Sequence, residues 1–244
     1  MHSWVQPFYA LQSRWTANLP TSDDDIARLQ AIHRHAGSGP HRILELGAGG
    51  GQSAFLAATV GHDVTAIELV AERAARARAL AANARTLTVL EGSFYDVPID
   101  GAFDLVLYWD GFGVGDDADQ RVLLRRIANW LAPHGSALID VYSPWFAAAS
   151  VGREMAFDGA RRRYDYEAEG NRWLDTWWPE DAPEQALTQS LRCYAPADFR
   201  LLLEGTGLEL QGVDPGAGPD GLGGWAEKTN LARCMSWLAT IGPA

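Results

Sequence analysis

The chain of 244 residues has only two cysteines, Cys193 and Cys234, and they lack the spacing of a disulfide framework. We therefore expect two reduced thiols in a cytoplasmic protein. Residues 1–9 lack a basic stretch followed by an apolar one, which argues against a signal peptide. No segment approaches the roughly 18 to 20 uninterrupted apolar residues of a membrane span, so we expect no membrane partner.

Positive charge is also scarce. Lys and Arg number 20 against 31 Asp and Glu, which gives a formal net charge of -11. A phosphate backbone would be repelled by such a protein, so we expect no nucleic-acid partner. The His, Cys, Asp and Glu residues show no metal-ligand spacing, and we expect no metal. No feature of the sequence specifies an oligomeric state.

Short apolar segments alternate regularly with helical segments in the first part of the chain. Helices are expected at 52–60, 71–84 and 120–131, and strands at 42–46, 63–67, 87–90, 103–108 and 136–141, with two later strands at 208–213 and 234–241. This alternation predicts an α/β fold, a doubly wound, mostly parallel, Rossmann-like sheet of seven strands. The length allows a single domain over residues 1–244.

Two segments rich in aromatic residues flank this pattern. We expect residues 1–36 to form helices that act as a lid over the main domain, with an N-cap at Ser22 before three aspartates. Residues 143–195 lose the helical period after the fifth strand. We expect them to form an insertion that contains antiparallel strands and binds the substrate.

A glycine-rich loop, Glu45-Leu46-Gly47-Ala48-Gly49-Gly50-Gly51, follows the first predicted strand and precedes a helix. Glycines let backbone approach a ligand, and the helix start presents unpaired N–H groups. A phosphate loop would need Lys and Ser or Thr after the last glycine, where this chain has Gln52-Ser53. The string Gly49 to Ala54 fits the relaxed dinucleotide pattern G-x-G-x-x-A, so a nicotinamide-dependent oxidoreductase remains an alternative.

Charged and aromatic residues at the strand ends favour a different nucleoside. Glu45 precedes the glycines, where a carboxylate suits a cationic ligand and would repel a pyrophosphate. Glu68 ends the second strand and can accept ribose hydroxyls, in either kind of cofactor. Trp109 and Asp110 follow the fourth strand, at the carboxyl edge where open α/β sheets bind ligands.

These motifs together resemble those of the class I S-adenosylmethionine-dependent methyltransferases, in particular the small-molecule type. The motifs that carry the resemblance are, in chain order, Glu45-x-Gly47-x-Gly49-x-Gly51, Glu68, Glu91-Gly92-Ser93-Phe94, Trp109-Asp110-Gly111 and Leu131 to Leu138. The match extends over roughly residues 40 to 142. It departs from the family at Ser93, where many members carry an aspartate that binds the adenine amine.

The resemblance implies S-adenosylmethionine as cofactor and S-adenosylhomocysteine as product. It implies that Glu45 and the loop backbone hold the methionine part, that Glu68 holds the ribose, and that Leu69, Ser93 and Phe94 contact the adenine. The cofactor-binding residues expected in this way are Glu45, Gly47, Ala48, Gly49, Gly51, Glu68, Leu69, Gly92, Ser93, Phe94 and Trp109.

Methyl transfer from a sulfonium mainly requires alignment of the reactants and exclusion of water. An amine needs only to be unprotonated, whereas a hydroxyl benefits from a base. We expect all six histidines to lie away from the carboxyl edge: His2, His33, His35, His41, His62 and His134. This favours N-methylation over O-methylation, with Asp110 as the candidate catalytic residue that orients or deprotonates the acceptor. A loop cap or a cofactor contact is its alternative role.

Aromatic residues outside the motifs are candidates for a substrate pocket, because such pockets are mostly apolar. The candidates are Tyr9, Trp15, Phe112, Trp145, Tyr164, Trp173 and Trp177. We expect about half of the aromatic candidates to be core residues. The predicted function is N-methylation of a small aromatic or heterocyclic metabolite in secondary metabolism. The alternatives are O-methylation of a small molecule, the oxidoreductase, and a protein that binds S-adenosylmethionine without catalysis.

Overall fold

The computed structural model describes residues 2–16, 20–221 and 224–244. Residues 1 and 17–19 of the expected lid segment, and residues 222–223 before the last strand, lie outside the described residues. None of the described helices is long and apolar enough to cross a membrane.

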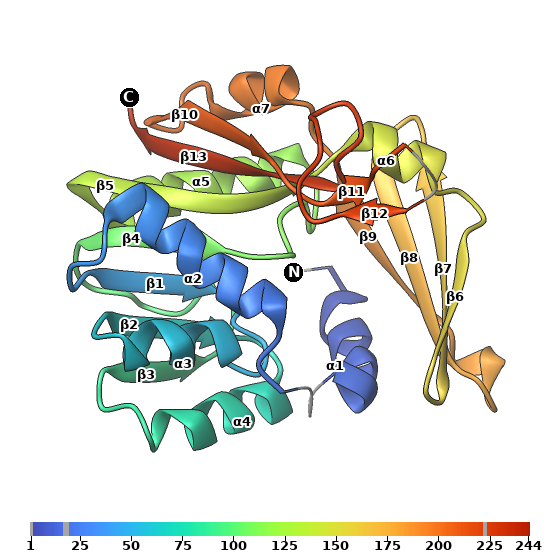
Figure 1. Cartoon of the computed structure of the whole chain (residues 1–244), viewed down its shortest axis with the longest axis horizontal. Coiled ribbons are helices and arrows are strands. Elements are labelled where there is room, and N and C mark those ends of the chain that lie inside the picture. The colour runs from blue at the N-terminus through green and yellow to red at the C-terminus, as the bar shows by residue number, and fades with distance from the viewer. Residues whose placement is uncertain (1, 17–19, 222–223) are drawn as a thin grey trace.

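A central sheet of seven strands has the order β10-β13-β5-β4-β1-β2-β3 (Figure 1). Its strands are β1 (Arg42–Leu46), β2 (Asp63–Glu68), β3 (Leu87–Glu91), β4 (Phe103–Tyr108), β5 (Leu131–Tyr142), β10 (Leu208–Pro215) and β13 (Ser236–Pro243). β3, β2, β1, β4 and β5 pair in parallel, and β13 is antiparallel to both β5 and β10. The doubly wound, mostly parallel sheet is therefore confirmed.

The start of β5 differs most from its expected position, while the other strand boundaries agree within two residues. β5 begins at Leu131, five residues before the expected start at 136. Leu131 pairs with Phe103, and regular pairing resumes between Leu105 and Ser136. Residues 132–135 therefore form an irregular stretch within the strand. Because Pro133 and Gly135 are unfavourable inside a strand, the sequence pattern predicted a turn here and not a strand.

Helices cover both faces of the sheet. α2 (Asp23–Ala36) and α3 (Gln52–Thr59) pack on one face with Ile43 and Leu105, and α5 (Asp117–Trp130) and α7 (Pro196–Leu203) pack on the other. α4 (Ala71–Ala81) runs beside α3. The Ser22 cap of α2 is present, since its hydroxyl accepts a hydrogen bond from the Asp25 amide at 3.3 Å.

A second, antiparallel sheet lies beyond the carboxyl end of the main sheet (Figure 1). Its strands follow chain order: β6 (Glu154–Phe157), β7 (Ala160–Glu167), β8 (Arg172–Pro179) and β9 (Leu187–Arg192). The helix α6 (Pro144–Ala149) leads into it from β5, and a 3-10 turn, η1 (Pro183–Gln185), joins β8 to β9. A small hairpin, β11 (Gly218–Pro219) and β12 (Trp225–Ala226), lies near α6 in Figure 1.

The first helix, α1 (Val5–Thr16), lies between the two sheets. It contacts β9 of the second sheet, and its buried Phe8 joins Ala160 and Trp177 in a small apolar cluster. The carboxyl ends of β1, β2 and β4 face α1, which places a helix directly across from the loops that the sequence assigns to the cofactor.

Candidate active site

The glycine loop after β1 adopts a conformation that side chains rarely tolerate. Gly47, Gly49 and Gly51 have φ values of 64°, 59° and 85°, in the left-handed region that favours glycine. A Cβ atom on Gly51 would lie 2.7 Å from the Cβ of Ala77, so α4 packs directly on the loop. The glycines therefore serve both the backbone turn and the close approach of a helix.

Glu68, at the end of β2, fastens this loop to the next one. Its Oε2 accepts a hydrogen bond from the Gly49 amide at 2.7 Å, and its Oε1 accepts one from the Val70 amide at 2.7 Å. Burial raises the pKa of Glu68, while these amides and the nearby Arg73 oppose that rise. The carboxylate is thus held in place beside the loop before any ligand binds.

Glu45, in β1, has an unsatisfied oxygen. Its side chain is only 3% exposed, and no described residue donates a hydrogen bond to Oε2. Burial raises the pKa of Glu45 to about 8, and Arg28 opposes the rise. An unpaired buried carboxyl oxygen costs free energy, which an ammonium group on a bound ligand would offset. Glu45 therefore fits the amino end of the cofactor that the resemblance implies.

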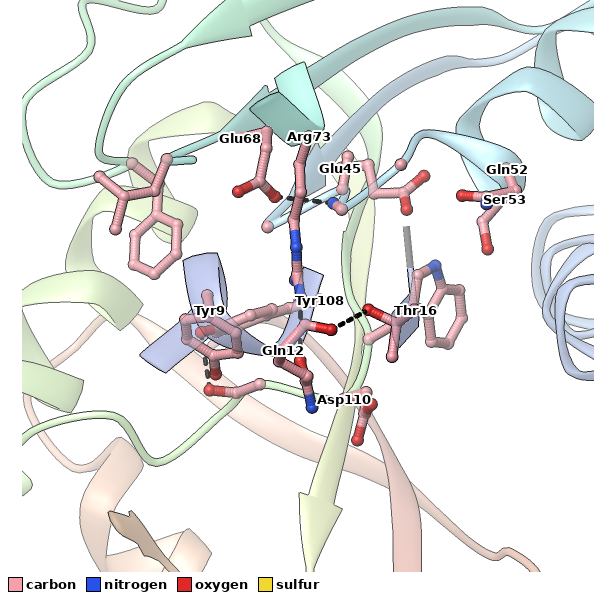
Figure 2. A pocket seen from close by; sticks show the side chains of 18 of the residues that line it. Tyr9, Gln12, Thr16, Glu45, Gln52, Ser53, Glu68, Arg73, Tyr108 and Asp110 are labelled. Carbon is pink, nitrogen blue, oxygen red and sulfur yellow. Dashed lines mark hydrogen bonds between the residues drawn. The ribbon is translucent and has the colours of Figure 1, made fainter. Parts of the chain in front are cut away.

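These loops enclose a cavity of about 350 Å³, the first cavity (Figure 2). It is lined by most of the residues expected to bind the cofactor: Glu45, Gly47, Ala48, Gly49, Glu68, Leu69, Ser93, Phe94 and Trp109. Gly51 and Gly92 do not line it. They shape its turns instead, because a Cβ on Gly92, at φ 149°, would lie 2.5 Å from Val97.

The segment after β3 supplies an aromatic wall. The Phe94 ring lies 5.3 Å from the Tyr108 ring and 5.0 Å from the Tyr95 ring, measured between centroids. The hydroxyl of Ser93 accepts a hydrogen bond from the Tyr95 amide at 3.1 Å. Because this contact uses a lone pair, the hydroxyl keeps its own hydrogen for donation.

Asp110 follows β4 and lines the first cavity on the side away from Glu68 (Figure 2). Its φ of 52° is uncommon for a residue other than glycine. The hydroxyl of Tyr142, at the end of β5, donates a hydrogen bond to its Oδ1. The carboxylate is accessible from cavity space but surrounded by protein, and this enclosure raises its pKa.

Comparisons with known proteins agree with this geometry. A family model described as a methyltransferase domain matches residues 43–135. The cypemycin N-terminal methyltransferase of a Streptomyces species is 27% identical over 209 residues, covering 82% of each chain.

The chain is an S-adenosylmethionine-dependent methyltransferase, with a methyltransferase domain over residues 43–135.

Solved structures share the fold of this methyltransferase. The CcbJ methyltransferase from Streptomyces caelestis has a TM-score of 0.72 at 18% identity, covering 98% of this chain and 96% of that chain. The glycopeptide N-methyltransferase MtfA has a TM-score of 0.61 at 20% identity and covers 91% of each chain. MtfA has also been solved with S-adenosylmethionine and with S-adenosylhomocysteine. S-adenosylmethionine is the cofactor, and the oxidoreductase alternative is wrong.

Polar contacts hold α1 of the methyltransferase over the first cavity (Figure 2). Arg73 of α4 donates hydrogen bonds from Nε to the Ser13 hydroxyl at 2.5 Å and from Nη2 to Gln12 Oε1 at 2.9 Å. Gln189 of β9 donates to the Tyr9 hydroxyl at 2.6 Å. Tyr9, predicted as a substrate residue, does line the cavity.

The other predicted substrate residues are not brought to the first cavity. Phe112 is fully buried in the core of the main sheet, 5.5 Å from the Phe199 ring. Trp173 is buried between Tyr142 and Tyr164, at centroid distances of 4.6 and 4.7 Å. An inserted sheet must bury one face, so its aromatic residues form its own core.

Trp15, Trp145 and Trp177 also lie outside the described cavities. The Trp177 ring is stacked between Trp15 and Phe157, at centroid distances of 6.1 and 5.2 Å. Trp145 is partly buried and packs against the clusters of both sheets. Trp15 and Trp177 thus join α1 to the second sheet, and Trp145 lies between the cores of the two sheets.

A second cavity, of about 340 Å³, adjoins the first. Both are lined by Arg28, Trp109 and Asp110. The second cavity is also lined by Asp140 and Tyr142 at the end of β5, and by residues from α2 and β13. Arg28, Asp140 and Tyr142 were not predicted as site residues, because a charged residue on a helix and polar residues in a strand belong to no sequence motif.

Proposed function

We propose that this methyltransferase methylates a nitrogen of a small metabolite, aromatic or heterocyclic, in secondary metabolism. One observation carries the proposal: among the described residues no histidine lines either cavity, whereas the carboxylate of Asp110 lines both. A carboxylate suffices to orient an amine and take its proton, while a hydroxyl acceptor gains more from a stronger base.

Two of the similar proteins support transfer to nitrogen. The cypemycin enzyme is named as an N-terminal methyltransferase, and MtfA as a glycopeptide N-methyltransferase. The CcbJ methyltransferase comes from a Streptomyces species, as the cypemycin enzyme does. These names agree with a secondary-metabolite acceptor that offers an amine.

The cofactor supplies an electrophilic methyl group when it is bound. In our proposal, Glu45 pairs with its ammonium group, Glu68 accepts its ribose hydroxyls, and Phe94 lies along its adenine. Arg28 is a candidate for its carboxylate, since the guanidinium lines the first cavity; it lies 3.6 Å from Asp25 and donates a long hydrogen bond, 3.3 Å, to Ser53. The chain's part is to hold and align these groups.

We also propose that α1 acts as the lid and that residues 143–195 complete the substrate-binding side. α1 lies across the first cavity and buries Val5 and Phe8 against the rest of the protein. A helix in this place excludes water from a reactive sulfonium and strengthens the electrostatic interactions beneath it. The second sheet supports it through Gln189.

The experiment is methyl transfer from labelled S-adenosylmethionine to matched pairs of small aromatic amines and alcohols, with products identified by mass spectrometry. We expect transfer to amines. An Asp110→Asn variant should lower kcat by roughly 10²-fold. Asp63→Asn, an exposed carboxylate at the start of β2, is the matched control and should not. Transfer to alcohols but not to amines would contradict the proposal, and full activity of Asp110→Asn would exclude Asp110 from catalysis.

A further inference from the structure

The second cavity stands where an acceptor has to approach. It meets the first cavity along Arg28, Trp109 and Asp110, at the carboxyl end of β4. Methyl transfer is an in-line displacement, so the nucleophile must be held next to the cofactor in a fixed orientation. A chamber that shares a wall with the first cavity meets this requirement.

An unsatisfied donor lies in the shared wall. Trp109 lines both cavities, is only 6% exposed, and its indole N–H has no hydrogen-bond partner among the described residues. A buried N–H without a partner costs free energy. An acceptor atom on a bound molecule, separate from any charged amine, would offset this cost.

The second cavity is lined by an excess of acidic residues. Asp140 and Asp110 lie near the ends of the adjacent strands β5 and β4. Burial of Asp140 raises its pKa to about 6; the positive charge of Arg28 opposes the rise, and the negative charge of Asp110 adds to it. Two nearby carboxylates in an enclosed site destabilise each other's charge, and a cation between them offsets both costs.

The cations of the second cavity are mostly engaged elsewhere. Arg28 lies 3.6 Å from Asp25, and Lys228 lies 3.4 Å from Asp214. The cavity wall also carries Arg34 and, on the acidic side, Asp24 and Glu227. Acidic residues therefore outnumber basic ones around the second cavity. Among the described residues, Asp110 and Asp140 form no ion pair with a lysine or arginine, whereas Asp25 and Asp214 do.

We propose that the second cavity binds the methyl acceptor, a basic amine that enters as its ammonium form with Asp110 and Asp140 as ion partners. This inference rests on the proposed N-methylation. The Tyr142 hydroxyl, which donates to Asp110, fixes one of the two carboxylates, and the edge-on contact of its ring with Trp173 fixes the tyrosine.

The reaction balances with these groups. The ammonium gives one proton to the Asp110 carboxylate, and the nitrogen lone pair then forms a bond to the methyl carbon. The carbon–sulfur bond breaks as this bond forms, and its electron pair goes to sulfur, which becomes a neutral thioether. The methylated amine is again a cation, and Asp110 releases its proton to water.

The test uses three small probes of similar shape and different charge: benzylamine, benzyl alcohol and benzoate. Each is titrated into the full-length protein saturated with S-adenosylhomocysteine, and binding is measured by ligand-observed NMR. We expect benzylamine to bind roughly tenfold more tightly than benzyl alcohol, and benzoate to bind more weakly than both. Asp140→Asn should remove most of the preference for the amine and leave the affinity for the alcohol unchanged.

Controls separate this inference from the proposed function. Asp63→Asn, at the other end of the sheet, should keep the preference, and circular dichroism should show each variant folded. Equal binding or no binding of amine and alcohol, a preference for benzoate, or an amine preference that survives in Asp140→Asn would each overturn the inference. Absence of S-adenosylhomocysteine binding in the wild-type protein would instead count against the proposed cofactor site.

Discussion

The two walls of the first cavity differ in what builds them. On the main-sheet side, the wall is backbone at Gly47 and Gly49, fixed by the buried Glu68. On the α1 side, the wall is side chain, and Arg73 and Gln189 attach it through a few hydrogen bonds. We expect the backbone conformation of the first wall to be rigid. We expect the hydrogen bonds of the second wall to open without loss of the fold. The predictions below test this contrast.

The largest effect is expected at Gly51. Alanine there would combine a φ of 85° with a Cβ placed 2.7 Å from Ala77, so Gly51→Ala should lower the free energy of unfolding by about 2 to 4 kcal/mol and abolish cofactor binding. Gly49→Ala meets no atom within 4 Å and should cost only about 1 kcal/mol. Urea unfolding measures both, and equal stability of the two variants would refute the tight packing of the loop on α4.

The next effect is expected at Glu68. Glu68→Ala leaves the amides of Gly49 and Val70 without their acceptor and removes the proposed ribose contact, so affinity for S-adenosylhomocysteine should fall by about 10- to 100-fold. Calorimetry measures the change. Glu72→Ala is the matched control, because Glu72 is exposed and pairs with Arg76 on the same helix. Unchanged affinity of Glu68→Ala would remove this residue from the site.

A smaller effect is expected when α1 is released. Arg73→Ala removes two hydrogen bonds to α1, each worth about 1 kcal/mol, so hydrogen exchange in residues 5–16 should speed up by about tenfold or more. The unfolding of the main domain should change little. Arg78→Ala, further along α4, loses an exposed ion pair with Glu91 and serves as control. If both variants exchange alike, Arg73 does not secure the lid.

The smallest effect is expected in the pH dependence of cofactor binding, through Glu45 in the main-sheet wall. Burial raises the pKa of Glu45 from an ordinary 4.5 to about 8, so its contribution to stability is greatest below pH 4.5 and is lost as the pH rises through 8. Ionised Glu45 is the form that pairs with an ammonium, so affinity for S-adenosylhomocysteine should rise by about threefold between pH 7.5 and 8.5, as the titration of a group with a pKa of about 8 predicts. Glu45→Gln should show no such rise, and a rise in that variant would assign the titration to another group.

Local patterns predicted the main sheet and its cofactor loop. An apolar run followed by glycines can be recognised in a few consecutive residues. The glycines are needed there because the loop backbone has a positive φ, as at Gly47. The second cavity was not predictable in this way. Asp140 and Arg28 meet there only through the strand order and the docking of α2. Aromatic residues were the hardest to assign from sequence. Phe112, a candidate for the substrate pocket, is buried in the core, since the same side chain suits a core and a pocket.

Helix α4 touches both walls of the first cavity, and this has a thermodynamic consequence. Helix α4 begins immediately after Val70, whose amide donates a hydrogen bond to Glu68. From the first turn of α4, Arg73 donates a hydrogen bond to Ser13 of α1. Whatever free energy the docking of α1 adds to cofactor binding, cofactor binding must return to the docking of α1, because coupling between two sites is reciprocal. The helix therefore links occupancy to closure, and an acceptor that arrives second meets a chamber already shaped by the first ligand.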